Sequence, residues 1–465
     1  MAGEILESSA IGLPFSVPDD WATPLLTDCC HFVRDGDWIE TKDQGGNDYR
    51  LLQISNIGLG GFVETGNYRW ITTATFERLR CTQIEPGDVL VARMPEPTGR
   101  CWFVSNLPWK AITAVDVAII RAEPGVLDPH FLSFFLNSPQ CLGVVRSLTT
   151  GTTRLRIRRA DIERLRVPLP RMSEQRAIAH ILGTLDDKVE LNERMNRTLE
   201  ATARALFKSW FADFDPVRAK SEGRDPHLPR HIADLFPESF MDSALGRIPK
   251  GWLVGVLSDA LVELETGGRP KGGVSGYSSG VPSIGAESIV GLGIFDYSKT
   301  KYVPREYFDK MTKGRVRSRD VLLYKDGGRP GQFEPHATLF GDGFPFDSCA
   351  INEHVYRLRA KPGFGQTLLF FWLSSDLVME EMRTKGTGVA IPGLNSTQVR
   401  SLTTLMPTLN VAQAFNTLLE PSIRRTLSNC NESRTLASLR DALLPKLISG
   451  ELRMKDAERI TSAAI

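Results

Sequence analysis

Few residues in this chain have the types and spacing that chemistry requires, and the first candidate is a set of carboxylates with a lysine. Glu40-Thr41-Lys42, preceded by Asp28, matches a pattern that holds a metal ion in many nucleases. Matches of this length are common by chance, and the comparable stretch later in the chain, which begins at Glu263, has no such lysine. We therefore expect no nuclease site and no catalytic residue here.

Motifs for phosphate and methyl transfer are also incomplete. The glycine-rich stretch that begins at Gly267 superficially resembles a phosphate-binding loop, but it lacks the Ser or Thr that would hold Mg²⁺. The sequence has neither an Asn-Pro-Pro-Tyr-like tetrapeptide to grip a flipped base nor a Gly-x-Gly turn with the acidic partner of a nucleoside-cofactor fold. A Gly-x-Ser-x-Gly elbow is missing too. These absences favour a binding subunit without a cofactor of its own.

The cysteines and histidines do not suggest a metal site. The seven cysteines are scattered and contain no Cys-x-x-Cys pair, which favours free thiols in a reducing compartment. Cys29-Cys30-His31 lacks a second pair of ligands, and His227 and His231 lack the Glu of a His-Glu-x-x-His motif. No apolar run approaches the roughly 18 residues of a membrane span. We expect a cytoplasmic protein with no metal and no membrane partner.

Basic residues form two local clusters although the net charge is only +1, which argues against coating nucleic acid by bulk charge. The first cluster comprises Arg154, Arg156, Arg158, Arg159, Arg164, Arg166 and Arg171. The second comprises Lys299, Lys301, Arg305, Lys310, Lys313, Arg315, Arg317 and Arg319. Either cluster alone could be a solvated face, but one in each half of the chain favours contacts with phosphates.

The elements that must position these clusters occur twice. Residues 151–211 run into a Leu-Pro and then a long amphipathic segment, and residues 386–448 repeat that order. Pro170 aligns with Pro407 and Gln175 with Gln413 in nearly one register. A period above 200 residues is far too long for a solenoid, so it indicates two tandem copies of a domain. Two similar heads suggest a ligand with two similar sites.

Each head is expected to be a mixed α/β domain, which makes the fold class α+β. Short apolar runs broken by glycine and polar turns, at 49–55, 87–93 and 115–121, predict strands. Residues 129–136 predict a short helix. Residues 251–407 repeat this pattern with more glycine.

A long helix is predicted after each head. Ser173 can cap the first, and apolar residues then recur at alternating spacings of four and three, which is typical of a coiled-coil seam. An ordinary amphipathic helix is the alternative, but polar Asn192 and Asn196 within the seam favour a paired helix. Pro421 should bend or interrupt the second helix. The predicted seam residues of the coiled coil are Leu185, Val189, Asn192, Asn196, Leu199, Leu206, Leu436, Leu439, Leu443 and Leu447.

This arrangement resembles the specificity subunit of type I restriction-modification systems over almost the whole chain. The resemblance is carried by Glu174-Gln175, by the segment from Ala205 through Asp213-Phe-Asp-Pro-Val-Arg, by Ile248-Pro-Lys-Gly-Trp and by the stretch that begins at Leu439. It implies two target recognition domains that each read half of a split DNA sequence, and two helices packed antiparallel as a spacer. It also implies partners: two methyltransferase subunits that bind S-adenosylmethionine, and two restriction and translocase subunits that use ATP and Mg²⁺.

The resemblance and the pattern together give a division of the chain. We expect target recognition domains at 16–170 and 251–407, spacer helices at 171–212 and 408–453, and a Pro-rich linker at 213–250. The first helix would span roughly 60 Å, more than one turn of DNA. From loop chemistry, the candidate DNA-binding residues are Arg154, Arg156, Arg158, Lys271, Arg315, Arg317 and Arg319. A stand-alone nuclease or methyltransferase and a protein-binding scaffold remain as alternatives.

Overall fold

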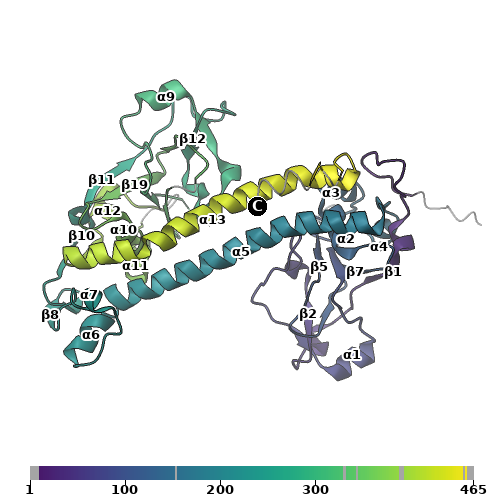
Figure 1. The fold of residues 1–465 in the computed structure, drawn as a ribbon, viewed down its shortest axis with the longest axis horizontal. Coiled ribbons are helices and arrows are strands. Elements are labelled where there is room, and N and C mark those ends of the chain that lie inside the picture. Colours follow the sequence, from purple (N-terminus) through teal and green to yellow (C-terminus); the bar gives the residue numbers. More distant parts are fainter. Residues whose placement is uncertain are drawn as a thin grey trace, which may run out of the picture. The chain divides into compact units, whose positions relative to one another are not determined.

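The computed structural model describes residues 10–151, 154–327, 331–341, 344–386, 392–453 and 456–457. The chain forms two compact units, which we call unit 1 (Met1–Lys188 with Leu436–Ile465) and unit 2 (Val189–Thr435). Two long helices, α5 (Met172–Phe211) and α13 (Leu409–Ser449), each contribute residues to both units (Figure 1). Ser173 therefore lies inside the first turn of α5 rather than before it, so its predicted capping role is wrong.

Unit 1 contains two sheets. An antiparallel sheet has the order β1-β7-β4-β5 and consists of Cys30–Asp35, Val117–Ala122, Asp88–Ala92 and Cys101–Phe103. A second sheet has the order β3-β2-β6 and consists of Trp70–Ile71, Tyr49–Leu52 and Ala111–Thr113, with β2 parallel to β6. The helices are α1 (Thr73–Leu79), α2 (Pro129–Asn137), α3 (Pro139–Ser147) and α4 (Arg159–Glu163), with 3₁₀ turns at Leu26–Cys29, Thr41–Asp43 and Ile54–Asn56. The strands and the short helix predicted from sequence for this unit are confirmed.

Local sequence explains these elements. Every residue of β4 is buried, and its Val-Leu-Val run suits a strand covered on both faces. Asp128 caps α2, since its Oδ1 accepts hydrogen bonds from the backbone N–H groups of His130 and Phe131 at 3.0 and 2.9 Å. Asp88, at the buried start of β4, accepts two bonds from Arg121 of β7, which neutralise its charge inside the sheet.

Unit 2 repeats the topology. Its antiparallel sheet has the order β11-β19-β16-β17 and consists of Leu261–Thr266, Val355–Ala360, Val321–Tyr324 and Ala337–Leu339. Its mixed sheet has the order β15-β12-β18 and consists of Lys301–Val303, Val281–Ile284 and Ala350–Ile351, with β12 parallel to β18. The following helices are α9 (Arg305–Lys310), α10 (Gln366–Leu373), α11 (Asp376–Lys385) and α12 (Ser396–Arg400). Unit 2 also has α8 (Leu257–Ala260), 3₁₀ turns at Ala286–Ser288 and Tyr297–Lys299, and the strand pairs β10 (Leu253–Val256) with β20 (Thr403–Met406) and β13 (Ile289–Gly291) with β14 (Ile294–Phe295).

The buried ion pair of unit 1 also recurs in unit 2. Asp320, at the start of β16, accepts a bond from Arg359 Nε at 2.9 Å. It accepts a second bond from Arg357, whose side chain is 2% exposed and also pairs with Glu263 and Glu265. Sequence reasoning did not single out these arginines.

The segment predicted as a Pro-rich linker, 213–250, is instead built from regular elements. It forms α6 (Asp215–Ser221), α7 (Arg230–Ala233) and a hairpin of β8 (Phe240–Ser243) and β9 (Gly246–Pro249). Pro216 is near the start of α6, where a missing N–H costs nothing. Val217, Phe236 and Ile248 are buried in the core of unit 2, and this burial explains why the segment is ordered.

Helix α13 runs without a break through Pro421, so the predicted interruption is wrong. Proline removes one backbone hydrogen bond from a helix interior. Packing offsets that loss, because Phe415, Leu419 and Ile423 on the same helix are at most 4% exposed within the core of unit 2. The same core contains Trp210 and Trp252. No helix in the described part of the chain is long and apolar enough to cross a membrane.

Candidate nucleic-acid interface

The arginines predicted to bind DNA in unit 1 differ in their pairing. Arg156 forms an ion pair with Asp116 at 2.9 Å, and Arg158 forms two hydrogen bonds with Asp161, each of 2.8 Å. Arg154 is exposed, and within residues 10–151 and 154–327 its guanidinium has no ion pair. A carboxylate partner weakens the attraction of an arginine for phosphate, so Arg154 has the stronger pull of the three.

The predicted arginines of unit 2 are held by the protein itself. Arg315 donates to the carbonyl oxygen of Asp309 and lies over the ring of Phe308. Arg317 pairs with Glu263 at 3.2 Å.

Arg319 and Lys271 are the least and the most available of the predicted residues of this unit for contact with a ligand. Arg319, whose side chain is only 18% exposed, pairs with Glu420 of α13 at 2.7 Å. This contact ties the segment before β16 to α13. Lys271 is exposed, and no described residue pairs with it. That any of these side chains contacts DNA stays a prediction.

The two long helices contact each other in each unit. In unit 2, Asn192 donates to Glu432 at 3.1 Å, and Asn429 donates to Asn196 at 2.9 Å. In unit 1, Asp186 pairs with Arg440 at 2.5 Å. In unit 2, Asn192 of α5 contacts Glu432 of α13, and Phe207 further along α5 contacts Phe415, which comes earlier in α13. The two helices therefore run antiparallel there.

The predicted seam residues are covered to different degrees. Leu185, Asn192, Leu436, Leu443 and Leu447 are buried, and Val189, Asn196, Leu199, Leu206 and Leu439 are half-buried. Asn192 and Asn429 are fully covered, yet the Oδ1 atom of each has no hydrogen-bond partner within the described chain. Buried polar groups of this kind disfavour other registers at some cost in stability.

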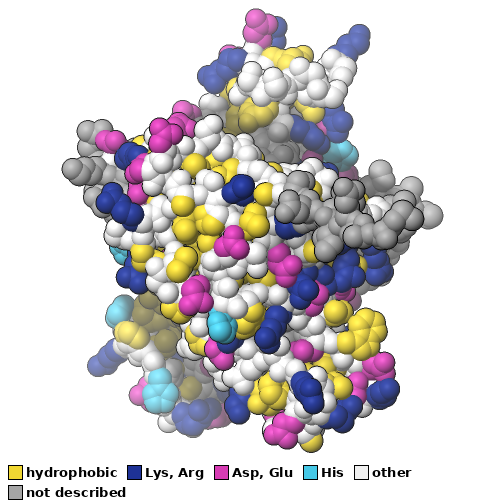
Figure 2. All heavy atoms as spheres, turned by 90° about the vertical axis from the view of Figure 1, so that its right-hand side faces the viewer, with side chains coloured by type: hydrophobic (Ala, Val, Ile, Leu, Met, Phe, Trp, Pro, Cys, Tyr) yellow, Lys and Arg dark blue, Asp and Glu magenta, His cyan; other side chains and the backbone are white. Residues whose placement is uncertain are grey.

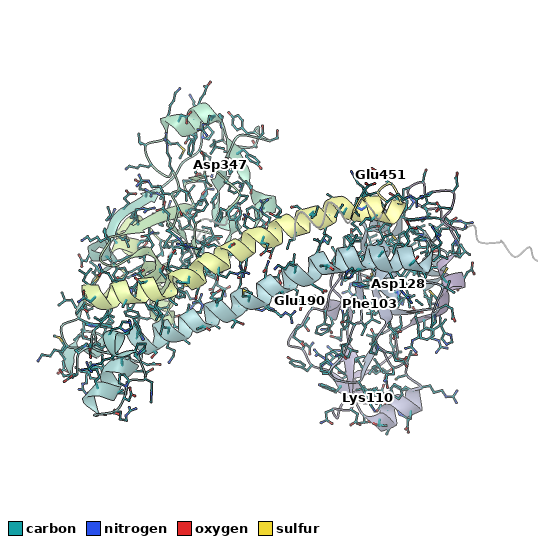
Figure 3. All side chains as sticks on the ribbon, in the orientation of Figure 1. Phe103, Lys110, Asp128, Glu190, Asp347 and Glu451 are labelled. Carbon is teal, nitrogen blue, oxygen red and sulfur yellow. The ribbon has the colours of Figure 1, made fainter. Side chains whose placement is uncertain are left out.

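In each unit a side-chain amide of the long helix bonds to the start of a short helix, α2 in unit 1 and α10 in unit 2. Gln175 of α5 accepts a bond from Asp128 N at 2.8 Å and donates to the carbonyl oxygen of Pro170 at 2.9 Å; Asp128 lies beside α5 in Figure 3. In unit 2, Asn416 of α13 makes the equivalent contact, because its side-chain oxygen accepts a hydrogen bond from the backbone N–H of Leu368 at 3.1 Å. Gln413, which sequence alignment paired with Gln175, is exposed. Equal sequence position therefore did not give equal structural role.

The described residues contain no group of three or more His, Cys, Asp or Glu that could hold a metal ion. Glu40 and Lys42 form a surface ion pair at 2.7 Å, which satisfies both charges without a metal. Burial raises the pKa of the thiols of Cys30 and Cys81 to about 12, so both stay protonated and poorly nucleophilic at neutral pH.

Charges of both signs lie together on one face of the molecule (Figure 2). On the face shown in Figure 2, Lys and Arg side chains alternate with Asp and Glu, as the net charge of +1 leads one to expect. A polyanion would therefore be held by a few local sites rather than by a general positive field.

Comparisons with known proteins agree with this arrangement. Residues 18–201 match the family model described as "Type I restriction modification DNA specificity domain". The chain is 25% identical to the type I restriction enzyme HindI specificity subunit of Haemophilus influenzae, over 79% of this chain and 87% of that protein. It is 24% identical to the MjaIX specificity subunit of Methanocaldococcus jannaschii, over 95% of each. The crystal structure of the type I S subunit from M. genitalium shares the fold, with a TM-score of 0.56 at 15% identity, covering 94% of this chain and 98% of that one.

Proposed function

We propose that this chain is a specificity subunit of a type I restriction-modification system and that, as a non-catalytic subunit, it reads a bipartite DNA target; its similarity to curated specificity subunits supports this. Each unit would act as a target recognition domain for one half-site. The observation that supports this most is the repetition, in both units, of one sheet topology followed by one long helix.

The long helices would form the spacer between the half-sites as an antiparallel coiled coil. The contacts of Asn196 with Asn429 and of Asp186 with Arg440 support that pairing. A spacer needs a single register, and buried asparagines are a known means of imposing one. The distance between half-sites would then follow from helix length.

The chemistry would be supplied by partner subunits. We propose that two methyltransferase subunits, which bind S-adenosylmethionine, and two restriction and translocase subunits, which use ATP and Mg²⁺, assemble on this chain. The relatives are named as subunits of type I restriction enzymes, and this supports an assembly of that kind. The seven free cysteines fit a reducing cytoplasm, where such an assembly would meet DNA.

The competing functions have less support. The comparisons do not support a stand-alone nuclease or methyltransferase, or a protein-binding scaffold. A subunit that serves methylation alone, without a nuclease partner, reads DNA in the same way, and the activities of the purified complex would distinguish the two.

A methylome comparison tests the proposal. Cells that express this chain with its methyltransferase should carry a new methyladenine motif of two short half-sites around a fixed gap. Cells with the methyltransferase alone are the control and should lack it. If the two proteins co-purify and no new motif appears, the proposed function is wrong.

A further inference from the structure

The repeated topology places one glycine at the same point in both units. Gly36 follows β1 and Gly267 follows β11, which are equivalent edge strands. A Cβ atom at Gly36 would lie 2.3 Å from the carbonyl oxygen of Ala114, and one at Gly267 would lie 1.6 Å from that of Ile351. Only glycine lets the two backbone segments approach so closely, so the path of the loop that follows is fixed in each unit.

A carboxylate ties this loop or its strand to the segment after a short helix. In unit 1, Asp37 accepts a hydrogen bond from the backbone N–H of Thr82, beyond α1, at 3.1 Å. In unit 2, Glu265 accepts one from the backbone N–H of Gly314, beyond α9, at 3.0 Å. The residues differ but the connection is the same. Each unit thus holds two surface segments side by side.

These paired segments lie on the open side of each unit. Figure 1 shows α1 on the side of unit 1 away from α5, and α9 on the side of unit 2 away from α13. The long helices therefore leave them uncovered. Both positions are available to a large ligand.

The unit 2 segments present lysines that no carboxylate of the described chain neutralises. In unit 2, Gly267, Gly268, Lys310 and Lys313 line a groove of about 360 Å³. Lys310, Lys313 and the neighbouring Lys271 are exposed, and none has an ion pair among the residues that the structure describes. Arg317 and Arg319, by contrast, have carboxylate partners. The lysines keep their full attraction for phosphate.

Unit 1 presents an aromatic ring with a cation at the corresponding place. Trp38, in the loop after Gly36, is 70% exposed, which is rare for a side chain with so much apolar surface. Arg80, next to the end of α1, is exposed and has a left-handed backbone conformation that turns the chain there. Trp38 and Arg80 belong to the two segments that the bond between Asp37 and Thr82 joins. A flat apolar ring suits a base edge or a thymine methyl group, and a cation suits a phosphate.

We propose that these equivalent pairs of segments are the duplex-DNA contact surfaces for the two half-sites. The pairs are residues 36–42 with 78–82 in unit 1 and residues 267–273 with 310–314 in unit 2. This rests on the proposed function. Lys310 and Lys313 hold phosphates of one half-site, and Trp38 contacts bases of the other. The arginines at 317 and 319 mainly support the fold of unit 2.

The unit 2 surface is tested in the assembled methyltransferase complex with a duplex that carries the methylated motif. Lys310→Ala with Lys313→Ala should weaken binding at least tenfold at 150 mM salt and reduce the slope of log affinity against log salt by about two, since each phosphate contact contributes about 0.9. Lys250→Ala with Lys361→Ala, which removes two exposed lysines elsewhere in unit 2, is the matched control and should change the affinity less than twofold.

Each outcome has a separate meaning. If the wild-type complex binds its motif and the Lys310/Lys313 variant has the same affinity and salt slope, the inference is overturned and the proposed function stands. If the wild-type complex binds no duplex with preference, the proposed function fails.

The unit 1 surface has its own readout. Trp38→Ala should lower the preference for the motif over a duplex with one altered half-site, and should do so for one half-site alone. Val126→Ala, another exposed apolar residue of unit 1, is the control. Wild-type discrimination at both half-sites by the Trp38 variant would overturn this part.

Discussion

Gly267 shows how a single hydrogen atom decides a local fold. Alanine there would place its Cβ 1.6 Å from the carbonyl oxygen of Ile351, so the two backbone segments would have to separate. We expect Gly267→Ala to lower the free energy of unfolding of unit 2 by about 2–4 kcal/mol. Urea denaturation followed by tryptophan fluorescence measures the change.

The control is a glycine in the same loop region with space around it. A Cβ at Gly276 would meet nothing within 4 Å, so Gly276→Ala should be neutral or slightly stabilising. Equal stability of the two variants would show that the crossing at Gly267 relaxes without cost.

Asp37 gives unit 1 a pH dependence. Burial raises the pKa of its carboxyl from the usual 3.8 to about 6, although hydrogen bonds from the Thr82 backbone and the Cys81 side chain act in the opposite direction. Between about pH 4 and pH 6 the folded state then binds more protons than the unfolded state, so this residue makes stability fall as pH rises through that window.

Asp37→Asn should remove that contribution while its amide oxygen still accepts from Thr82. We expect the stability of the variant relative to wild type to increase from pH 4.5 to pH 6.5, as measured by urea denaturation at several pH values. Parallel stability curves for the two proteins would contradict the assignment.

At the scale of elements, α13 contains a proline that its packing tolerates. Pro421 is exposed, and it cannot donate the backbone hydrogen bond that a helix interior normally makes. Pro421→Ala should therefore raise the free energy of unfolding by about 1–3 kcal/mol and raise the melting temperature of the complex. Pro229→Ala, before α7 and outside any helix interior, should give no gain. A loss of stability in Pro421→Ala would mean that the proline relieves strain elsewhere in α13.

Periodicity in the sequence was enough to predict the long helices and several strands. Apolar spacing placed the first helix within a residue of α5, and short apolar runs between glycines and polar turns located β2, β4 and β7. Two predictions from proline were wrong. The rule that proline interrupts regular structure considers only its missing backbone N–H and its fixed backbone angle, and not the packing around it. At Pro421 packing outweighs that rule, and across 213–250 the prolines sit at element starts and turns while Val217 and Phe236 supply a core.

The candidate interface was harder to predict than the fold. Sequence shows where arginines gather but not which carboxylate each one meets, and Arg319 meets Glu420 from about a hundred residues away. Gln175 and Gln413 share a sequence position, but only the first is buried and bonded to the start of α2. Such roles depend on contacts between distant segments, which composition and spacing do not record.

At the scale of the whole molecule, helix length should set the DNA gap. Seven residues inserted into α5 and seven into α13, both at mid-helix, lengthen an antiparallel pair by about 10 Å. That is about three base pairs at 3.4 Å each. We expect the methylated motif to keep its half-sites and to gain about three base pairs between them, as read from a methylome.

The control for this insertion lies outside the helices. The same seven residues placed in the exposed turn at 222–228, after α6, should leave the motif unchanged. A folded double-insertion protein that methylates the original motif would rule out the spacer role of the helices.

Unit 1 is built from two segments that lie far apart in the sequence, and this affects how the protein is synthesised. Its first part ends at Lys188 and its last part begins at Leu436, with contacts such as Asp186 to Arg440 and Asp20 to Arg453 joining the two. At about 5–20 residues per second, a ribosome needs roughly ten to fifty seconds to synthesise the stretch between them. During that time the apolar face around Leu182 and Leu185 has no helix to cover it. Translation itself is therefore the stage at which this chain is most open to aggregation and to proteases.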